Sequence, residues 1–94
     1  MEHRIIKAAA HRDFTLKLVF EGGDRARVDL GTFMAGAQVA ERLRADPELF
    51  MTGLRIEGDG DWLSWPGDVD IDADALWYKA HPEELERDFG DAAA

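Results

Sequence analysis

The clearest pattern along the chain is an alternation of apolar and polar residues between residues 14 and 30. The apolar positions of the first run are Phe14, Leu16, Leu18 and Phe20. After a turn at Gly22, Gly23 and Asp24, the alternation resumes with Ala26, Val28 and Leu30. A period of two places alternate side chains on one face of a strand. The pattern therefore predicts a hairpin of two strands with one buried face.

The same apolar positions predict which residues face one another across this hairpin, because a slip of one residue would expose the whole apolar set. A three-residue loop at 22–24 pairs Phe20 with Ala26, Leu18 with Val28 and Leu16 with Leu30. It also sets Glu21 opposite Arg25 and Lys17 opposite Asp29, and such pairs contribute roughly 0.2–1 kcal/mol each. We expect these acids to neutralise a small basic patch formed by Lys17, Arg25 and Arg27.

Three further extended segments are predicted. The run from Arg4 to Ala9 is short and partly β-branched, which favours a first strand. Residues 54–57 and 61–65 flank Gly58, Asp59 and Gly60, which indicates a second hairpin. Trp62 and Trp65 are three positions apart, so one of them is expected at a strand end or partly exposed. Pro66 and Gly67 end this strand, and residues 68–73 are expected to form an extended loop.

Helical spacing replaces the alternation between residues 31 and 45. One arc of this segment carries Phe33, Gly36, Ala37, Val39, Ala40 and Leu43. A glycine inside a helix costs about 1 kcal/mol relative to alanine, so we expect the regular part to begin after Gly36. Asp46 and Pro47 form a capping residue and a first-turn proline, which predict a short helix ending near Met51 with Leu49 and Phe50 in the core.

Two more helices are expected in the last quarter of the chain. The first is capped by Asp72 or Asp74 and packs through Leu76, Trp77 and Ala80. The second starts at Pro82, because proline and acids suit a first helical turn. Leu85 and Phe89 are its apolar pair, and Gly90 is expected to stop it before a frayed end.

Together these elements predict an α+β fold, in which a small antiparallel sheet of about five strands in hairpins is packed by two or three helices. The chain has 94 residues, and we expect a single domain over 1–94. Residues 1–80 form its core, and residues 81–94 form a C-terminal acidic helix and a frayed tail.

Charge is distributed unevenly along the chain. Residues 1–55 contain nine Lys/Arg and eight Asp/Glu, whereas residues 56–94 contain two and twelve. The acidic part repels phosphates, so we expect no direct binding of nucleic acid. It attracts basic protein surfaces instead. The chain has no cysteine, which suits a reducing, cytoplasmic location, and no apolar run is long enough to predict a membrane span.

The aspartates at alternate positions, Asp68, Asp70, Asp72 and Asp74, are the most conspicuous candidates for a cation site. Ca²⁺ prefers several such oxygen ligands. The EF-hand pattern fails here, because Ala73 stands at its glycine position and Lys79 at its bidentate glutamate. Alternating aspartates on the exposed side of an extended segment, followed by a helix cap, explain the run more simply. We therefore expect no metal site.

Catalytic chemistry finds little support in the sequence. His3, His11 and His81 are widely separated, without the spacing of zinc ligands. Ser64 lies between two tryptophans and outside any nucleophile elbow, so we expect it to be a strand residue. The tryptophans Trp62, Trp65 and Trp77 either fill the core or, where partly exposed, mark an interface. We expect no catalytic residue, no cofactor and no enzyme activity.

Four segments resemble the small bacterial proteins called domain of unknown function 2442. They are Phe14 to Phe20 with its glycine turn, Arg27 to Leu30, Leu43 with Asp46 to Phe50, and Trp65 to Trp77. The last is the most specific. Gly67 and Asp68 follow Pro66 where the family usually has asparagine and glycine, and Trp77 replaces or precedes the usual tyrosine at Tyr78.

The resemblance implies an α+β domain with no established reaction. Some members of the family carry an added helix-turn-helix domain, which we do not expect here because the chain ends at Ala94. Others resemble the antitoxin half of toxin–antitoxin pairs and are accompanied by a small partner protein. The resemblance therefore implies a partner-binding, antitoxin-like module and provides no catalytic residues.

Our leading hypothesis is that the acidic stretch from Asp59 to Asp88 binds a small basic protein, in a contact that weakens with salt. The residues expected at this contact are Trp65, Asp68, Asp70, Asp72, Asp74, Trp77 and Leu85. The alternative is a self-associating structural domain. In that case an unpaired sheet edge, either Ile5 to Ala9 or Leu54 to Glu57, pairs with a second copy to give a homodimer.

Overall fold

A computed structural model describes residues 3–93 of the chain. Its elements, in chain order, are β1 (Ile5–Ala10), β2 (Thr15–Phe20), β3 (Arg25–Asp29), α1 (Gly31–Gly36), η1 (Gln38–Ala40), α2 (Glu41–Ala45), α3 (Pro47–Thr52), β4 (Arg55–Glu57), η2 (Gly58–Gly60), β5 (Trp62–Trp65), β6 (Val69–Asp72), α4 (Ala73–Ala80) and α5 (Pro82–Ala93). The two η segments are single turns of 3₁₀ helix.

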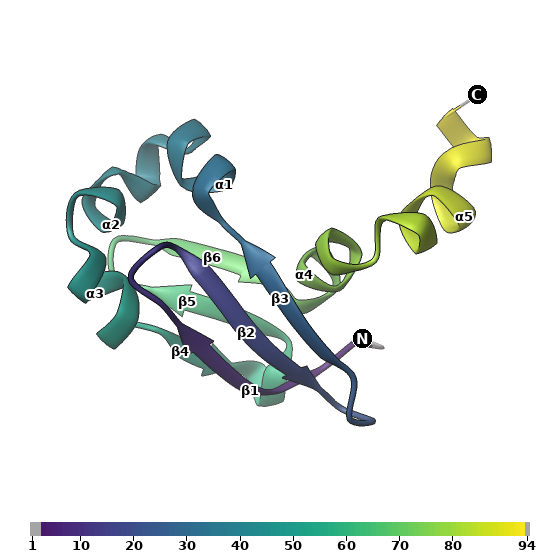
Figure 1. Ribbon diagram of the computed structural model, residues 1–94, viewed down its shortest axis with the longest axis horizontal. Helices are drawn as coiled ribbons and strands as arrows, with labels where there is room; N and C mark the ends of the chain where they lie inside the picture. The colour runs from purple at the N-terminus through teal and green to yellow at the C-terminus, as the bar shows by residue number, and fades with distance from the viewer. Residues whose placement is uncertain (1–2, 94) are drawn as a thin grey trace.

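The strands form two antiparallel sheets of three strands each, in the orders β1-β2-β3 and β4-β5-β6. The two sheets form two layers, with α1, α2 and α3 on one side and α4 on the other (Figure 1). Edge strand β1 also contacts β4 and η2. The predicted α+β class and both predicted hairpins are confirmed, although the strands belong to two sheets.

Strand β6 occupies the segment that we expected to be a loop, so that prediction is wrong. Val69 and Ile71 are buried, whereas Asp70 and Asp72 are exposed. This is the period of two of a strand with one buried face. Pro66 and Gly67 predicted a loop here, and aspartate is depleted in strands overall. On solvent-facing positions, however, Asp70 and Asp72 do not disturb the packing of the core.

The first hairpin has the predicted faces and a loop of odd length, but its predicted register is wrong. Leu18 faces Ala26, Leu16 faces Val28, and Lys17 faces Arg27. The Phe20 amide donates to the Asp24 carbonyl, so the loop is 21–23 and not 22–24. Gly22 and Gly23 both have positive φ, and they position this tight loop. A slip of two residues leaves the same side chains buried, so the apolar pattern cannot exclude it.

The segment 31–45 is helical on both sides of Gly36, which corrects the expectation of a start after it. Glycine ends α1, where its cost is low, and the chain then bends at Ala37, which is extended (φ −110°, ψ 114°). The 3₁₀ turn that follows has about three residues per turn, which breaks the predicted arc. As a result Val39 is 58% exposed, and Met34 is buried instead.

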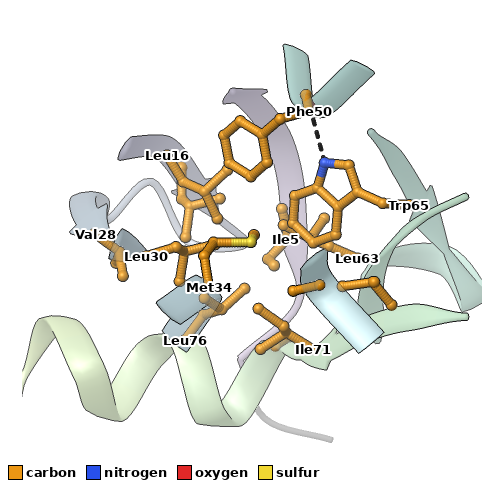
Figure 2. Close-up of a cluster of buried hydrophobic side chains, with 14 of the residues drawn as sticks. Ile5, Leu16, Val28, Leu30, Met34, Phe50, Leu63, Trp65, Ile71 and Leu76 are labelled. Atoms are coloured by element: carbon orange, nitrogen blue, oxygen red, sulfur yellow. Dashed lines mark hydrogen bonds between the residues drawn. The ribbon is translucent and has the colours of Figure 1, made fainter. Parts of the chain in front are cut away.

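Short helix α3 forms as predicted. Oδ1 of Asp46 accepts a hydrogen bond from the Leu49 amide at 3.1 Å, and Pro47 is the first helical residue. Phe50 on this helix is fully buried and stacks on Trp65, with ring centroids 5.3 Å apart. The Trp65 indole nitrogen donates to the Phe50 carbonyl at 2.9 Å, shown as the dashed line in Figure 2.

The core lies between the two sheets and the first four helices. Figure 2 shows side chains from both sheets converging with those of the helices on one apolar cluster. Helix α4 contributes Leu76 and Trp77, as predicted. Helix α5 starts at Pro82 as predicted, but it continues through Gly90 to Ala93, so glycine does not stop it. The side chain of Phe89, the predicted partner of Leu85, lies outside the described residues.

Candidate functional site

The residues that we expected at a partner contact do not form one surface. Trp65 is 3% exposed and belongs to the core, so it cannot contact a partner, and that prediction is wrong. A partly exposed tryptophan does exist, but it is Trp62, at 37% exposure on the outer face of β5. Residues three apart cannot share a strand face, so the sequence predicted that either Trp62 or Trp65 is exposed. It could not show which of the two.

The four aspartates lie along the β5–β6 turn, β6 and the start of α4. Asp68 occupies the turn with a positive φ, and Asp70 and Asp72 lie on the exposed face of β6. Asp74 lies in the first turn of α4 and is half-buried. Residues 70 and 72 face Ser64 and Trp62 across the sheet. Among the described residues, no group of three or more acidic or histidine side chains could hold a metal ion.

Trp77 is held between two histidines from distant parts of the chain. The ring of His3 stacks on it with centroids 4.2 Å apart, and the ring of His81 stacks at 3.9 Å. Phe20 contacts the indole edge-on at 5.0 Å. Trp77 is consequently only 8% exposed. It packs distant parts of the chain together and is not an exposed contact residue. The spacing of His3 and His81 in the sequence does not reveal this stacking.

His81 also links α4 to α5. Its Nδ1 lies 2.8 Å from the Trp77 carbonyl, and its backbone nitrogen donates to the same oxygen. One turn away, the Tyr78 hydroxyl donates to Asp88 Oδ2 at 2.9 Å. This hydrogen bond to a carboxylate raises the pKa of Tyr78 above its usual value, because it favours the neutral phenol. Helix α5 is therefore tied to α4 at Asp88, in the middle of the helix.

Helix α5 projects away from the sheets (Figure 1), and most of its described charged side chains are exposed. Arg87 is its single described cation, and it contacts Glu84 at 3.1 Å and Asp88 at 3.4 Å. Glu83 and Glu86 are exposed, and neither forms an ion pair with a described residue. Leu85 is 44% exposed on the same helix. Of the expected contact residues, Leu85 is thus the one that lies on this projecting helix.

A second charged surface covers the outer face of β1-β2-β3. It is an open groove of about 740 Å³ with four cationic side chains, which are Lys7, Lys17, Arg25 and Arg27. We call it the basic groove. The sequence predicted a small basic patch of Lys17, Arg25 and Arg27 here, but its predicted neutralisation is wrong, because it relied on a register that placed acids opposite Lys17 and Arg25. In the structure Arg27 and Val19 occupy those positions.

One acid neutralises part of the basic groove. Asp13 Oδ2 lies 4.0 Å from Arg27, and its Oδ1 accepts hydrogen bonds from the Thr15 hydroxyl at 2.6 Å and the Thr15 amide at 3.2 Å. These bonds lower the pKa of Asp13, because they favour the carboxylate. Lys7, Lys17 and Arg25 form no ion pair with any residue between 3 and 88 whose side chain is described. The groove therefore remains positively charged.

The described residues form an α+β domain built from two small antiparallel sheets. The family model described as protein of unknown function (DUF2442) matches residues 5–82. The chain belongs to this family. The match covers both sheets and α4 and ends at Pro82, the first residue of α5. Neither the curated proteins nor the solved structures gave a match.

In the described part of the chain, no helix combines the length and the apolar character needed to cross a membrane.

Proposed function

We propose that the chain is a non-enzymatic, antitoxin-like module that binds a small basic protein through its acidic C-terminal half. Helix α5 carries this proposal, because it projects from the domain with exposed acids and the half-exposed Leu85. An apolar residue surrounded by charge is a common arrangement at protein interfaces, where the charges guide association and the apolar contact adds affinity. The lack of cysteine suits a reducing, cytoplasmic setting, and the family resemblance implies a bacterial one.

The structure narrows the surface that we expected from the sequence. Trp65 and Trp77 are buried, so the apolar contact rests on Leu85. Asp70 and Asp72 lie on β6 and add negative charge that attracts a basic partner at longer range. The direct contact in this proposal is α5, and the rest of the acidic half increases the rate of encounter.

The alternative, self-association through a sheet edge, finds less support. The two edges named for it, β1 and β4, contact each other within the chain, and η2 also packs on β1. A Cβ at Gly60 in η2 would clash with the carbonyl oxygen of Ile5. Little room remains along that edge for a further strand.

The test is co-purification from the native host with a tagged chain, at low and high salt. The wild type is compared with E83K/E86K on α5 and with E21K/E41K, which changes the net charge equally at exposed residues elsewhere. We expect a small basic protein to co-purify in near-stoichiometric amount with the wild type and with the control at low salt. High salt should remove it. E83K/E86K should lose it. Retention by E83K/E86K, or equal loss from both variants, would refute the proposal.

A further inference from the structure

The basic groove contains an electrostatic conflict that the fold does not resolve. Lys17 and Arg27 are directly opposite each other on β2 and β3, and Lys7 and Arg25 flank Val19 in the neighbouring row. Like charges directly opposite across strands destabilise a sheet. Asp13 provides one counter-charge, at 4.0 Å from Arg27. An anionic occupant would relieve the remaining repulsion.

The lining of the groove also indicates what kind of anion fits. Between the cations lie apolar side chains, of Ala9 and Val19 from the sheet and of Ile56 from β4. Ile56 is 40% exposed, so the occupant can bury it. A ligand that combines carboxylates with an apolar side chain matches this surface better than a bare phosphate does.

We propose that the basic groove binds helix α5 of a second copy of this chain. Glu83 and Glu86 lie three residues apart on α5, so their Cβ atoms are about 5–6 Å apart. Directly opposite residues such as Lys17 and Arg27 have Cβ atoms about 4.5–5.5 Å apart. Two acids on one helix face therefore match two cations on the sheet in spacing and in sign. The methylene groups of the two glutamates supply the apolar contact, because Leu85, two residues after Glu83 and one before Glu86, points to a different side of α5.

The helix comes from another copy because of its direction in the fold. Figure 1 shows α5 leaving from α4 and pointing away from both sheets. Each copy carries one groove and one projecting helix. Two copies that exchange their helices satisfy both grooves, which gives a closed two-fold dimer.

A polyphosphate is a poorer occupant than α5. Residues 56–94 contain twelve acids and two cations, and the whole chain has a net charge of −9. Four cations on one sheet face act against this field, which repels a nucleic acid. A helix of the same chain brings only a few acids to the groove and leaves most of its negative charge in solvent.

This inference goes beyond the proposed function and uses the same helix in a different contact. In the absence of a basic protein, α5 is covered by the groove of a second copy, and a more basic partner displaces it. The two proposals fail separately. Reversing the groove charges removes self-association but leaves α5 free for the partner, whereas reversing the charges of α5 removes both contacts.

The experiment measures the mass of the purified full chain by sedimentation equilibrium, at low and high salt. The variants are K17E/R27E in the groove, E83K/E86K on α5, and R42E on α2 as an exposed control outside both surfaces. Circular dichroism and urea unfolding verify that each variant folds. We expect the wild type and R42E to dimerise at low salt. For each double variant the dissociation constant of the dimer should rise by at least about tenfold. Equimolar mixing of the two double variants should restore a dimer, because each then meets an oppositely charged surface.

Three results would overturn the proposal. One is a wild-type chain that stays monomeric at low salt and millimolar concentration. Another is a K17E/R27E chain that dimerises as the wild type does. The third uses a labelled single-stranded oligonucleotide as a probe: if the wild type binds it, K17E/R27E does not, and the mass of the chain is the same in both, the groove is a nucleic-acid site.

Discussion

The basic groove and helix α5 are opposite in charge, and they differ in how the fold holds them. The groove is part of a three-stranded sheet whose other face is the apolar core, so its cations occupy positions set by strand pairing. Helix α5 is tied to the domain at two places, through His81, which directly precedes it, and through the hydrogen bond from Tyr78 to Asp88 in the middle of the helix. We call the sheet that carries the basic groove the platform, because the core fixes it, and we call the projecting helix α5 the arm.

This difference in attachment indicates which of the two surfaces loses more conformational entropy on binding. A platform held by a packed core loses little conformational entropy on binding, whereas an arm with few tertiary contacts loses more. Such an arm can also change partners, because leaving one surface costs the fold nothing. We therefore expect core substitutions to affect both surfaces through folding, and α5 substitutions to affect binding alone.

The largest expected effect separates the platform from the arm by stability. Leu18 is 2% exposed beneath the groove, and Leu85 is 44% exposed on α5. Leu18→Ala should lower the free energy of unfolding by about 2–5 kcal/mol, because it leaves a cavity in the core. Leu85→Ala should change it by no more than about 0.5 kcal/mol. Urea unfolding followed by tryptophan fluorescence measures both, and equal losses would contradict the distinction.

The next effect concerns the edge where η2 supports the platform. Gly60 and Gly67 both have positive φ, but of the two only Gly60 lies where an added Cβ would clash with backbone, at the carbonyl oxygen of Ile5. Each alanine substitution costs about 1 kcal/mol or more for the strained φ. We expect Gly60→Ala to cost at least about 1 kcal/mol more than Gly67→Ala, because β1 must shift. Equal thermal denaturation midpoints would show that η2 does not hold β1.

A smaller effect reports on the attachment of the arm. Tyr78 is the only tyrosine in the sequence, so its titration can be followed by phenolate absorbance. Its pKa is raised by the hydrogen bond to Asp88, so the stabilisation is complete below the ordinary value of about 10 and is lost as pH rises through the folded pKa. Asp88→Asn should lower the titration midpoint, and Glu41→Gln should leave it unchanged. A midpoint that is insensitive to Asp88→Asn would contradict this attachment.

The smallest expected effect concerns the acid at the rim of the groove. Asp13 partly neutralises Arg27, and Asp13→Asn keeps an oxygen that can accept the Thr15 hydrogen bond. An exposed ion pair contributes about 0.2–1 kcal/mol, so its removal should tighten the dimer by up to about fivefold at low salt. Sedimentation of Asp13→Asn beside Asp24→Asn in the hairpin loop measures the change. A weaker dimer for Asp13→Asn would argue against an anion in the groove.

The sequence predicted local structure well where one physical preference dominates. Alternation predicted β2 and β3, and Asp46 with Pro47 predicted α3, because burial and capping act over a few residues. It failed where two arrangements satisfy the same pattern. A slip of two residues in the first hairpin keeps every buried side chain buried, so only the loop glycines decide the register.

The candidate surfaces followed from that register and from tertiary contacts. The basic groove exists because Lys17 faces Arg27, which the preferred pairing had excluded. The sequence could not show that Trp77 is buried, because His3 and His81, which stack on it, are far apart in sequence. Pro66 and Gly67 predicted a loop over the segment of β6, although Val69 and Ile71 alternate there with aspartates, which is the pattern of a strand.

The most direct test of the account locates α5 on the platform in solution. The chain has no cysteine, so Arg87→Cys provides a single site on α5 for a nitroxide label. The labelled chain is mixed at low salt with an isotope-labelled wild-type copy, and the broadening of amide signals is measured by NMR. The account predicts intermolecular broadening around Val19, Lys17 and Ala9, removed by high salt. Broadening that is confined to β4-β5-β6, or its absence at concentrations where the chain is dimeric, would contradict it.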